Sequence, residues 1–376
     1  MLKLDKISLE GYKSIKQCRD LRLEKLNVLI GANGSGKSNF LSFFKLLNFE
    51  MNGALQEFIG RNGGRDSLLY LGAKVTSHIT AELEMRSELG NKYNYRMTLA
   101  DAAPDTLVFT AEQFPATEVH FGAGQPVLVP SRLNLGSGHR ESVLLSPKLA
   151  EDEYAKFVRN TLTHFRFYHF HDTSDQSHMR SRSDLRGPPY LLPDGDNLAA
   201  HLHLLREKQP ECYQRVVETV HLVFPFFRDF VLEPDNGGGN FVMLRWKATG
   251  SAEYDFGPHQ VSDGTLRFMA LATLLLQPHD WLPRLITIDE PELGLHPYAI
   301  KILASLIQDA ANFTQIIVAT QSAALVDEVG PEDVVVANLE EGATTFQRLD
   351  PESLADWLKD YSLSQIWETN LFGGRP

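Results

Sequence analysis

A run of eight residues near the start of the chain has the composition and spacing of a phosphate-binding loop. The run reads GANGSGKS, residues 31–38, and fits the pattern G-x-x-x-x-G-K-[ST] in full. Its glycines let backbone N–H groups turn inward around an anion, and a helix that starts near Gly36 would add its dipole. Lys37 can reach the β- and γ-phosphates of a nucleotide, and the Ser38 hydroxyl can ligate Mg²⁺. A glycine-rich turn without a ligand is the weaker interpretation, because a strand and a helix are predicted on either side.

An acidic pair follows a buried strand much later in the chain. The segment LITI ends in Asp289 and Glu290. Strands of a parallel sheet end at a common edge, so Asp289 is expected beside the phosphate loop, where it would hold Mg²⁺ directly or through water. Glu290 would polarise the attacking water as a general base. The alternative interpretation is an acidic turn after a core strand. The presence of the phosphate loop favours the magnesium and catalytic roles over this alternative.

Buried strands and helices must position these residues. Three short apolar runs are typical of strands in a parallel sheet: LNVLI (26–30), LITI (285–288) and IIVAT (316–320). SNFLSFFKLLNF (38–49) predicts a buried helix directly after the phosphate loop. A second helix is predicted from Asp263 onward with Ser262 as its N-cap, and its free N–H groups would form another anion site.

The remaining segments predict further strands, helices and one loop. Period-two spacing indicates an edge strand at residues 1–10, several antiparallel strands within 75–121 and a single strand at 241–246. Helical spacing indicates two helical segments, at 150–165 and 196–223. A mobile loop is predicted around Arg180, Arg182 and Arg186. Trp367 and Phe372 are expected to be exposed.

These patterns divide the chain into four parts. The phosphate loop belongs to an N-terminal part of the core, and the acidic pair belongs to a C-terminal part with the closing residues. An antiparallel β subdomain and a helical lobe are inserted between them. The predicted boundaries are 1–74, 75–149, 150–240 and 241–376.

Composition limits the classes of protein that the chain can belong to. The 376 residues are 43% apolar and 22% charged, which is ordinary for a soluble globular protein of two or three folding units. No window reaches the roughly 18 apolar residues of a membrane span, and Cys18 and Cys212 form no disulfide framework. A cytoplasmic protein without membrane contact is therefore expected. The net charge of −12 argues against a broad nucleic-acid-binding surface.

Several motifs together resemble the RecF, SMC and OLD-type ATPases of the ABC class. GANGSGKSN, with Asn33 and Asn39, is similar to their phosphate loop, and KISLEGYKSIK (6–16) to their first strand and turn. SDGTLR (262–267) resembles their signature motif, and IDEPELGLHP (288–297) their magnesium-site strand and dimer-contacting loop. The resemblance spans essentially the whole chain. It implies an α/β fold of the P-loop NTPase type, an ABC-ATPase head with the β subdomain and helical lobe inserted.

The resemblance also implies a reaction and a dimer. ATP with Mg²⁺ would be bound and hydrolysed, with Ser38 and Asp289 as the magnesium residues. Two chains would stack head to tail, so that Ser262 and Gly264 of one chain meet the γ-phosphate held by the other. The catalytic residues would be Glu290, Lys37 and Gln321. The nucleotide-binding residues would be Asn33, Gly34, Ser35, Gly36, Lys37, Ser38, Asn39, Ser262, Asp263 and Gly264.

Some positions depart from that family pattern. Gln321 stands where many relatives have a histidine on the γ-phosphate, and a glutamine carries no positive charge. Slow hydrolysis is therefore expected, and the alternative is that the Gln321 contact senses the γ-phosphate. FYHFHDTS (167–174) lies where the glutamine loop is expected but contains no glutamine. Arg61 and Arg65 lie where related heads keep an arginine finger, with solvated surface arginines as the alternative.

The partner of this ATPase is less constrained by the sequence. No long heptad array separates the motifs, and only about 55 residues follow Gln321, too few for a fused nuclease domain. A nuclease controlled by this ATPase is therefore expected to be a separate polypeptide. The family resemblance implies a regulator of such an effector in DNA repair, genome maintenance or phage defence. The alternatives are an ATP-gated nucleic-acid clamp and the nucleotide subunit of a transporter. A metal site at His169 and His171 lacks the usual ligand spacing, and core packing is the stronger interpretation.

Overall fold

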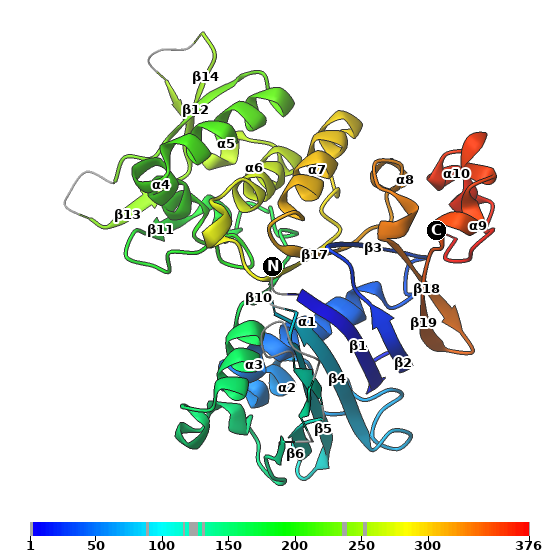
Figure 1. Cartoon of the computed structure of the whole chain (residues 1–376). Coiled ribbons are helices and arrows are strands. Elements are labelled where there is room, and N and C mark those ends of the chain that lie inside the picture. The colour runs from blue at the N-terminus through cyan, green and yellow to red at the C-terminus, as the bar shows by residue number, and fades with distance from the viewer. Residues whose placement is uncertain are drawn as a thin grey trace.

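A six-stranded, mostly parallel sheet forms the centre of the molecule (Figure 1). The computed structural model describes residues 3–87, 90–115, 117–119, 127–129, 132–234, 239–250 and 254–375. The strand order is β10 (Phe165–Tyr168), β16 (Leu285–Asp289), β17 (Gln315–Ala319), β3 (Leu26–Ile30), β18 (Val334–Glu340) and β19 (Ala343–Arg348). Only β19 is antiparallel, as the second strand of a hairpin with β18. The three apolar runs predicted as strands are confirmed as β3, β16 and β17.

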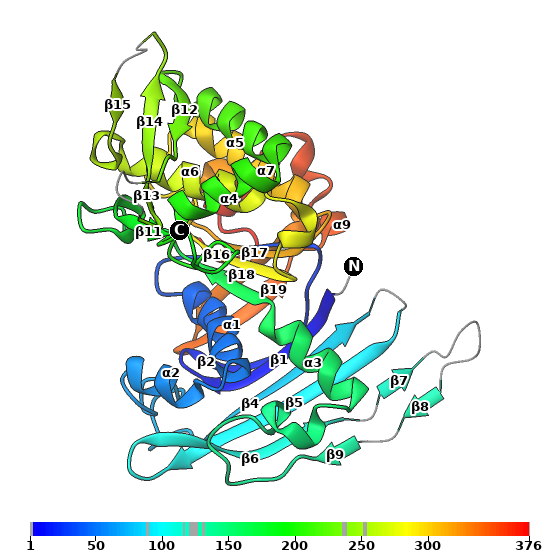
Figure 2. The ribbon, with the colours of Figure 1, turned by 90° about the vertical axis from the view of Figure 1, so that its left-hand side faces the viewer.

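The two faces of this sheet carry different layers, as Figure 2 shows. On β3, Val28 and Ile30 face one hydrophobic cluster and Leu29 faces the other, because side chains alternate along a strand. The first cluster contains the helices α4 (Leu198–Lys208), α5 (Pro210–Val223), α6 (Asp263–Leu275) and α7 (Pro297–Ala310). The second contains α1 (Lys37–Met51), α2 (Leu55–Arg61) and α3 (Glu153–Thr163). The helix that begins at the phosphate loop and the helix capped by Ser262 therefore pack on opposite faces.

A second, antiparallel sheet covers the α1 layer from outside. Its order is β2 (Ile15–Arg22), β1 (Lys3–Tyr12), β4 (His78–Arg86), β5 (Lys92–Ala102), β6 (Thr106–Phe114) and β9 (Arg132–Asn134). The prediction of an edge strand at residues 1–10 is wrong, because β1 pairs with both β2 and β4. Alternating burial identifies a strand with one wet face, but it cannot tell an inner strand from an edge. The last strand pattern, at 117–121, lies partly outside the described residues.

The inserted lobe combines α4 and α5 with short strands. One three-stranded sheet contains β12 (Phe227–Val231), β14 (Arg245–Ala248) and β15 (Asp255–Phe256), and a two-stranded sheet pairs β11 (Arg182–Asp184) with β13 (Phe241–Met243). Outside this lobe, β7 (Thr117–Val119) pairs with β8 (Val127–Val129). The strand predicted at 241–246 therefore splits at Leu244 between two sheets. The helical segment predicted at 196–223 breaks at Gln209, before Pro210.

Three expectations about exposure are wrong. Phe372 is partly buried and packs against the first hydrophobic cluster. Arg180, which we predicted in a mobile loop, is 4% exposed and its guanidinium donates to Asp263. Trp367 is fully buried in α10 (Leu363–Glu368), which lies near α8 (Ala323–Val326) and α9 (Pro351–Leu354). Arg180 and Trp367 have local sequences that look like surface, and only long-range contacts bury them. Among the residues that the structure describes, no helix is both long and apolar enough to cross a membrane.

A buried acid cluster joins α1 to the antiparallel sheet. The Tyr95 hydroxyl lies 2.6 Å from Glu50 Oε1 and 2.9 Å from Glu112 Oε1, and both carboxyl groups are fully buried. His139 Nε2 lies 2.9 Å from the other Glu112 oxygen. Burial, and then the charge of Glu112, raise the pKa of Glu50 well above its ordinary 4.5. The folded chain therefore favours the neutral form of Glu50.

This shift predicts that Glu50 makes folding pH-dependent. An acid with a raised folded pKa takes up a proton on folding above pH 4.5, so its contribution to stability falls as the pH rises. Glu50→Gln cannot ionise, so at pH 8 its free energy of unfolding should exceed that of the wild type by about 1 kcal/mol or more. Urea denaturation measures this difference. The difference should shrink toward pH 5. Glu151→Gln, at an exposed position, is the control, and a difference that does not change with pH would contradict the assignment.

Candidate nucleotide site

The phosphate loop is held by close backbone approaches at two glycines. A Cβ on Gly31 would overlap the carbonyl oxygen of Ala337 on β18, and a Cβ on Gly36 would overlap the Thr344 hydroxyl on β19. Gly36 also has a φ of 98°, a left-handed value that glycine adopts without strain. The loop needs glycine here because the β18–β19 hairpin lies directly against it.

Lys37 lies over this loop. Its ammonium donates to the carbonyl oxygens of Gly31 at 2.6 Å and Ala32 at 2.9 Å. Burial lowers its pKa, and the carboxylates of Glu290, Asp289 and Glu292 partly oppose that shift. The hydroxyl of Ser35 is buried without a hydrogen-bond partner in the described part of the chain. A buried ammonium and an unpartnered hydroxyl fit an anion with several acceptor oxygens.

The predicted magnesium residues come together. The Ser38 hydroxyl donates to Asp289 Oδ1 at 3.2 Å, although the two residues lie 251 positions apart. Burial raises the pKa of Asp289, while the Ser38 bond lowers it. A hydroxyl and a carboxylate at one place are the oxygen ligands that Mg²⁺ prefers. The donor set therefore fits this ion, and Ser38 and Asp289 would hold it.

The predicted catalytic pair also meets. Gln321 Nε2 donates to Glu290 Oε1 at 2.5 Å. Glu290 has a φ of 43°, a left-handed value that is uncommon for a residue with a side chain. Such values concentrate at functional sites, where the surrounding structure enforces them.

Glu292 is a third acidic residue that the sequence reasoning missed. Its Oε1 accepts from the Thr320 hydroxyl at 2.5 Å and from the Gln321 backbone N–H at 3.2 Å. Burial raises its pKa, and the Thr320 bond partly offsets this. Glu292 thus fixes the chain segment that carries Gln321. Its place two residues after Glu290 was visible, but nothing local indicated that it bridges to the end of β17.

His171 occupies the segment in which the glutamine loop was expected. Its Nε2 donates to the backbone carbonyl of Asp289 at 2.9 Å, so it touches the magnesium-site strand. His169 lies beside it with ring centroids 4.9 Å apart. Burial, and then His171, lower the pKa of His169. Within the described ranges, no three or more His, Cys, Asp or Glu residues are grouped so that they could hold a metal ion.

The start of α6 carries the segment that resembles the signature motif. Ser262 caps the helix, its Oγ accepting from the Thr265 N–H at 3.2 Å. A Cβ on Gly264 would overlap the Gly294 carbonyl, so glycine is needed for close packing here. Arg180 Nη2 donates to Asp263 Oδ1 at 2.7 Å and fixes the same turn from the inserted lobe.

The two arginine-finger candidates make local ion pairs. Arg61 is exposed and pairs with Glu57 at 2.5 Å, one helical turn away. Arg65 pairs with Asp101 at the end of β5 and with Asp105 in the turn before β6. These contacts account for both arginines without a nucleotide, and the finger role stays a prediction.

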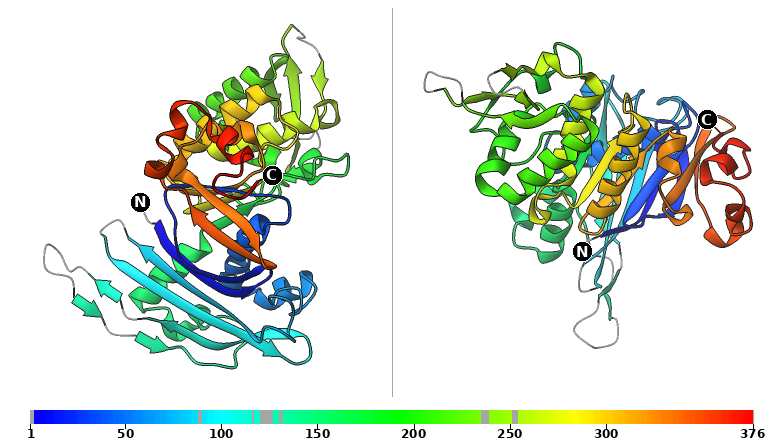
Figure 3. Two further views of the ribbon diagram at one scale, coloured as in Figure 1. Left: turned by 90° about the vertical axis from the view of Figure 1, so that its right-hand side faces the viewer. Right: turned by 90° about the horizontal axis from the view of Figure 1, so that it is seen from above.

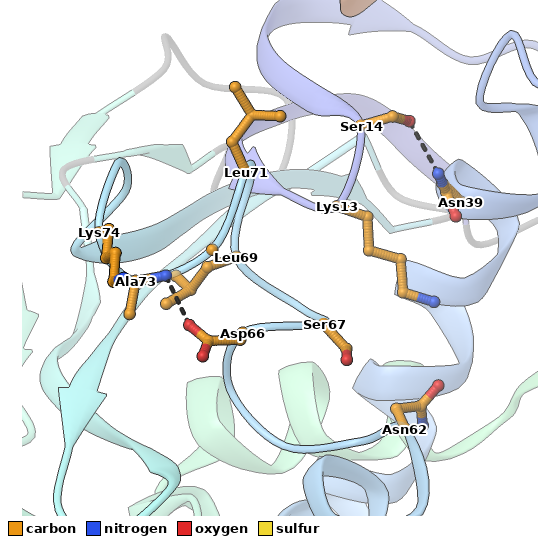
Figure 4. A pocket seen from close by; sticks show the side chains of 11 residues that line it. Lys13, Ser14, Asn39, Asn62, Asp66, Ser67, Leu69, Leu71, Ala73 and Lys74 are labelled. Atoms are coloured by element: carbon orange, nitrogen blue, oxygen red, sulfur yellow. Dashed lines mark hydrogen bonds between the residues drawn. The ribbon is translucent and has the colours of Figure 1, made fainter.

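A cavity of about 750 Å³ opens next to the first turn of α1 (Figure 4). At one end, Asn39 Nδ2 donates to Ser14 Oγ at 2.8 Å. Lys13 lines it as well, and burial lowers its pKa, with a contribution from the charge of Lys45. Because Asn39 directly follows Ser38, the cavity adjoins the phosphate loop and is large enough for a nucleoside.

Comparisons with known proteins agree with this geometry. The family model described as "AAA domain, putative AbiEii toxin, Type IV TA system" matches residues 26–327, and the chain belongs to this family. No curated protein matches the sequence. The chain is similar in fold to a crystal structure of an Smc head bound to the C-terminal winged-helix domain of ScpA. That match has a TM-score of 0.61 and 16% identity, and covers 93% of this chain and 99% of that one.

A second similar structure supports the same fold. It is an Smc head domain with an extended coiled coil, bound to the C-terminal domain of ScpA from Pyrococcus furiosus. The match has a TM-score of 0.61 and 14% identity, and covers 96% of this chain and 99% of that one. The predicted α/β P-loop fold of the ABC-ATPase head is confirmed. The chain is thus an AAA-domain protein with the fold of the SMC head ATPase domains.

Glu292 should support turnover by positioning Gln321. Glu292→Ala leaves the Thr320 hydroxyl and the Gln321 N–H without their acceptor, so Gln321 should no longer be held against Glu290. The kcat for ATP should then fall at least about tenfold, because a proton-transfer group acts only when it is positioned. Glu292→Gln keeps an accepting oxygen and is expected to retain most of the activity. Steady-state phosphate release measures both variants. Equal loss in both would show that Glu292 acts through its charge instead.

Proposed function

We propose that this chain binds ATP with Mg²⁺, hydrolyses it slowly, and dimerises head to tail around it. The observation that carries the proposal is the pair of contacts Ser38–Asp289 and Gln321–Glu290. They bring four predicted site residues from three strand ends to one place. An acidic turn with only a structural role would not require this arrangement.

Different site residues would contact the phosphates, the magnesium ion and the nucleoside. The phosphates would lie on the backbone N–H groups of residues 33–38, with the Lys37 ammonium moving from the loop carbonyls to the β- and γ-phosphates. Magnesium, when bound, neutralises phosphate charge, and Ser38 and Asp289 would hold it. The ribose and base would enter the cavity lined by Lys13, Ser14 and Asn39.

Hydrolysis would depend on Glu290 as the general base. Glu290 would take a proton from a water molecule while the water oxygen attacks the γ-phosphorus and the bond to the β–γ bridging oxygen breaks, giving ADP and phosphate. The Gln321 amide would orient Glu290 by its 2.5 Å bond. Because this amide is neutral, it would stabilise the transition-state charge less than a protonated histidine, which supports a slow rate.

The dimer follows from the two faces of the central sheet. α1 and its phosphate loop pack on one face, and α6, capped by Ser262, packs on the other. A γ-phosphate on one loop would therefore be contacted by Ser262 and Gly264 of a second copy. The exposed positions of Ser262 and Leu293 leave this surface open to a partner. A twofold arrangement would use both sites at once.

We also propose that the dimer controls a separate effector protein in phage defence or DNA repair. The support is the family description, which refers to a toxin of a toxin–antitoxin system. The net charge of −12 favours a protein effector over a nucleic acid as the direct partner. The ATP-trapped dimer is the state in which this effector should be sought.

Removal of the Lys37 charge should prevent nucleotide binding. Lys37→Ala should weaken the affinity for ATP at least about 100-fold, because each charge-assisted bond to phosphate contributes about 1.5–3 kcal/mol. Isothermal titration with Mg-ATP measures this. Lys45→Ala, an exposed lysine on the same helix, should bind normally. Unchanged affinity of Lys37→Ala would refute the phosphate site.

Removal of the general base should trap the dimer. Glu290→Gln keeps the contact with Gln321 but cannot take a proton, so the variant should elute as a dimer with Mg-ATP on a sizing column, with kcat reduced at least about 100-fold. Adding Ser262→Arg should return it to a monomer that still binds ATP, because the added side chain would block the γ-phosphate of the partner. A Glu290→Gln variant that stays monomeric at saturating ATP would contradict head-to-tail closure.

A further inference from the structure

The C-terminal segment, residues 362–375, lies against the phosphate loop although more than 300 positions separate them in sequence. In Figures 2 and 3 the end of the chain is drawn beside the loop that leads from β3 to α1. A Cβ on Gly374 would lie 3.4 Å from the Cα of Gly31, the first residue of the phosphate loop. The backbone at Gly374 is therefore in packing contact with the site.

Specific hydrogen bonds hold the segment in this place. The indole Nε1 of the fully buried Trp367 donates to the Gly374 carbonyl at 2.5 Å. The Gly374 N–H donates to Asn338 Oδ1 at 2.5 Å. Gly374 has a φ of 67°, and a Cβ there would lie 2.6 Å from Val336 Cγ1, so the site admits only glycine without rearrangement. A backbone so constrained is built for its contact with Gly31.

The other end of the segment is fixed near Gln321. Both the N–H and the hydroxyl of Ser364, in α10, donate to the Asp327 carboxylate at 2.8 Å. Asp327 directly follows α8, which is capped by Ser322, the neighbour of Gln321. The C-terminal segment is therefore held at one end by the residue that follows α8 and reaches the start of the phosphate loop at the other.

We propose that the C-terminal segment is a positioning element of the nucleotide site, and that its Gly374 backbone holds the phosphate loop in its binding conformation. A glycine-rich loop loses much conformational freedom when it binds, and a contact that orders Gly31 beforehand removes part of that cost. Ala337 lies against Gly31 on β18, so the first residue of the loop is fixed between two backbones. This inference rests on the proposed binding of ATP and adds a residue set that tunes its affinity.

Gly374→Ala tests the inference against a matched control. The added methyl group would overlap Val336 Cγ1 and would strain the left-handed backbone, so the segment beside Gly31 must shift. The Kd for Mg-ATP should then rise about tenfold, a size that mutations along a coupled network produce. The kcat at saturating ATP should change far less, because Glu290 and Gln321 are untouched. Gly342→Ala, in the β18–β19 turn, carries a similar strain, with a φ of 81°, but its Cβ would meet nothing within 4 Å. It should bind ATP like the wild type.

A second variant covers the case in which Gly374→Ala does not fold. Trp367→Phe removes the N–H that donates to Gly374 and leaves a smaller aromatic ring in the core, so it should raise the Kd in the same direction with an unchanged kcat. Thermal melting without nucleotide checks that each variant is folded. Affinity equal to that of Gly342→Ala in both variants would overturn the role of the segment. A wild-type chain that binds no ATP would instead overturn the proposed function itself.

Discussion

The parallel register of β3, β17 and β16 is the constraint on which the site depends. Val28 lies beside Val318, and Val318 beside Ile288, so the phosphate loop, Gln321 and the acidic pair all leave the sheet at the same edge. The 3.2 Å contact between Ser38 and Asp289 is a direct consequence. A shift of one strand by one residue would turn its side chains to the opposite face and separate these groups.

The electrostatics of the site favour a nucleotide only when a cation accompanies it. Three carboxyl groups, on Asp289, Glu290 and Glu292, lie near a single buried ammonium, Lys37. Burial raises the pKa of Asp289 and of Glu292, so these groups are already costly to charge. A triphosphate would add more negative charge to the same place. Divalent metal is therefore expected as a partner of ATP here, as the ligand set of Ser38 and Asp289 indicates.

The sequence predicts the parts of the site that are encoded locally. The loop 31–38, the strands that end at Asp289 and Gln321, and the cap at Ser262 each depend on a few neighbouring residues, and the structure has each of them. Arg180 and Trp367 were misassigned because their burial comes from segments far along the chain. The sequence did not identify Glu292 as a site residue for the same reason, because its partners at the end of β17 are 28 and 29 positions away.

The signature turn is fixed to the same strand ends from the opposite face of the sheet. Arg267 of α6 donates to the carbonyls of Phe170 and His171, and His171 donates to that of Asp289. Gly264 packs on Gly294, four residues after Glu290. A change at the acidic pair would therefore reach the start of α6 through packed contacts. The proposed coupling of hydrolysis to dimer opening would need such a path, and these contacts would supply one.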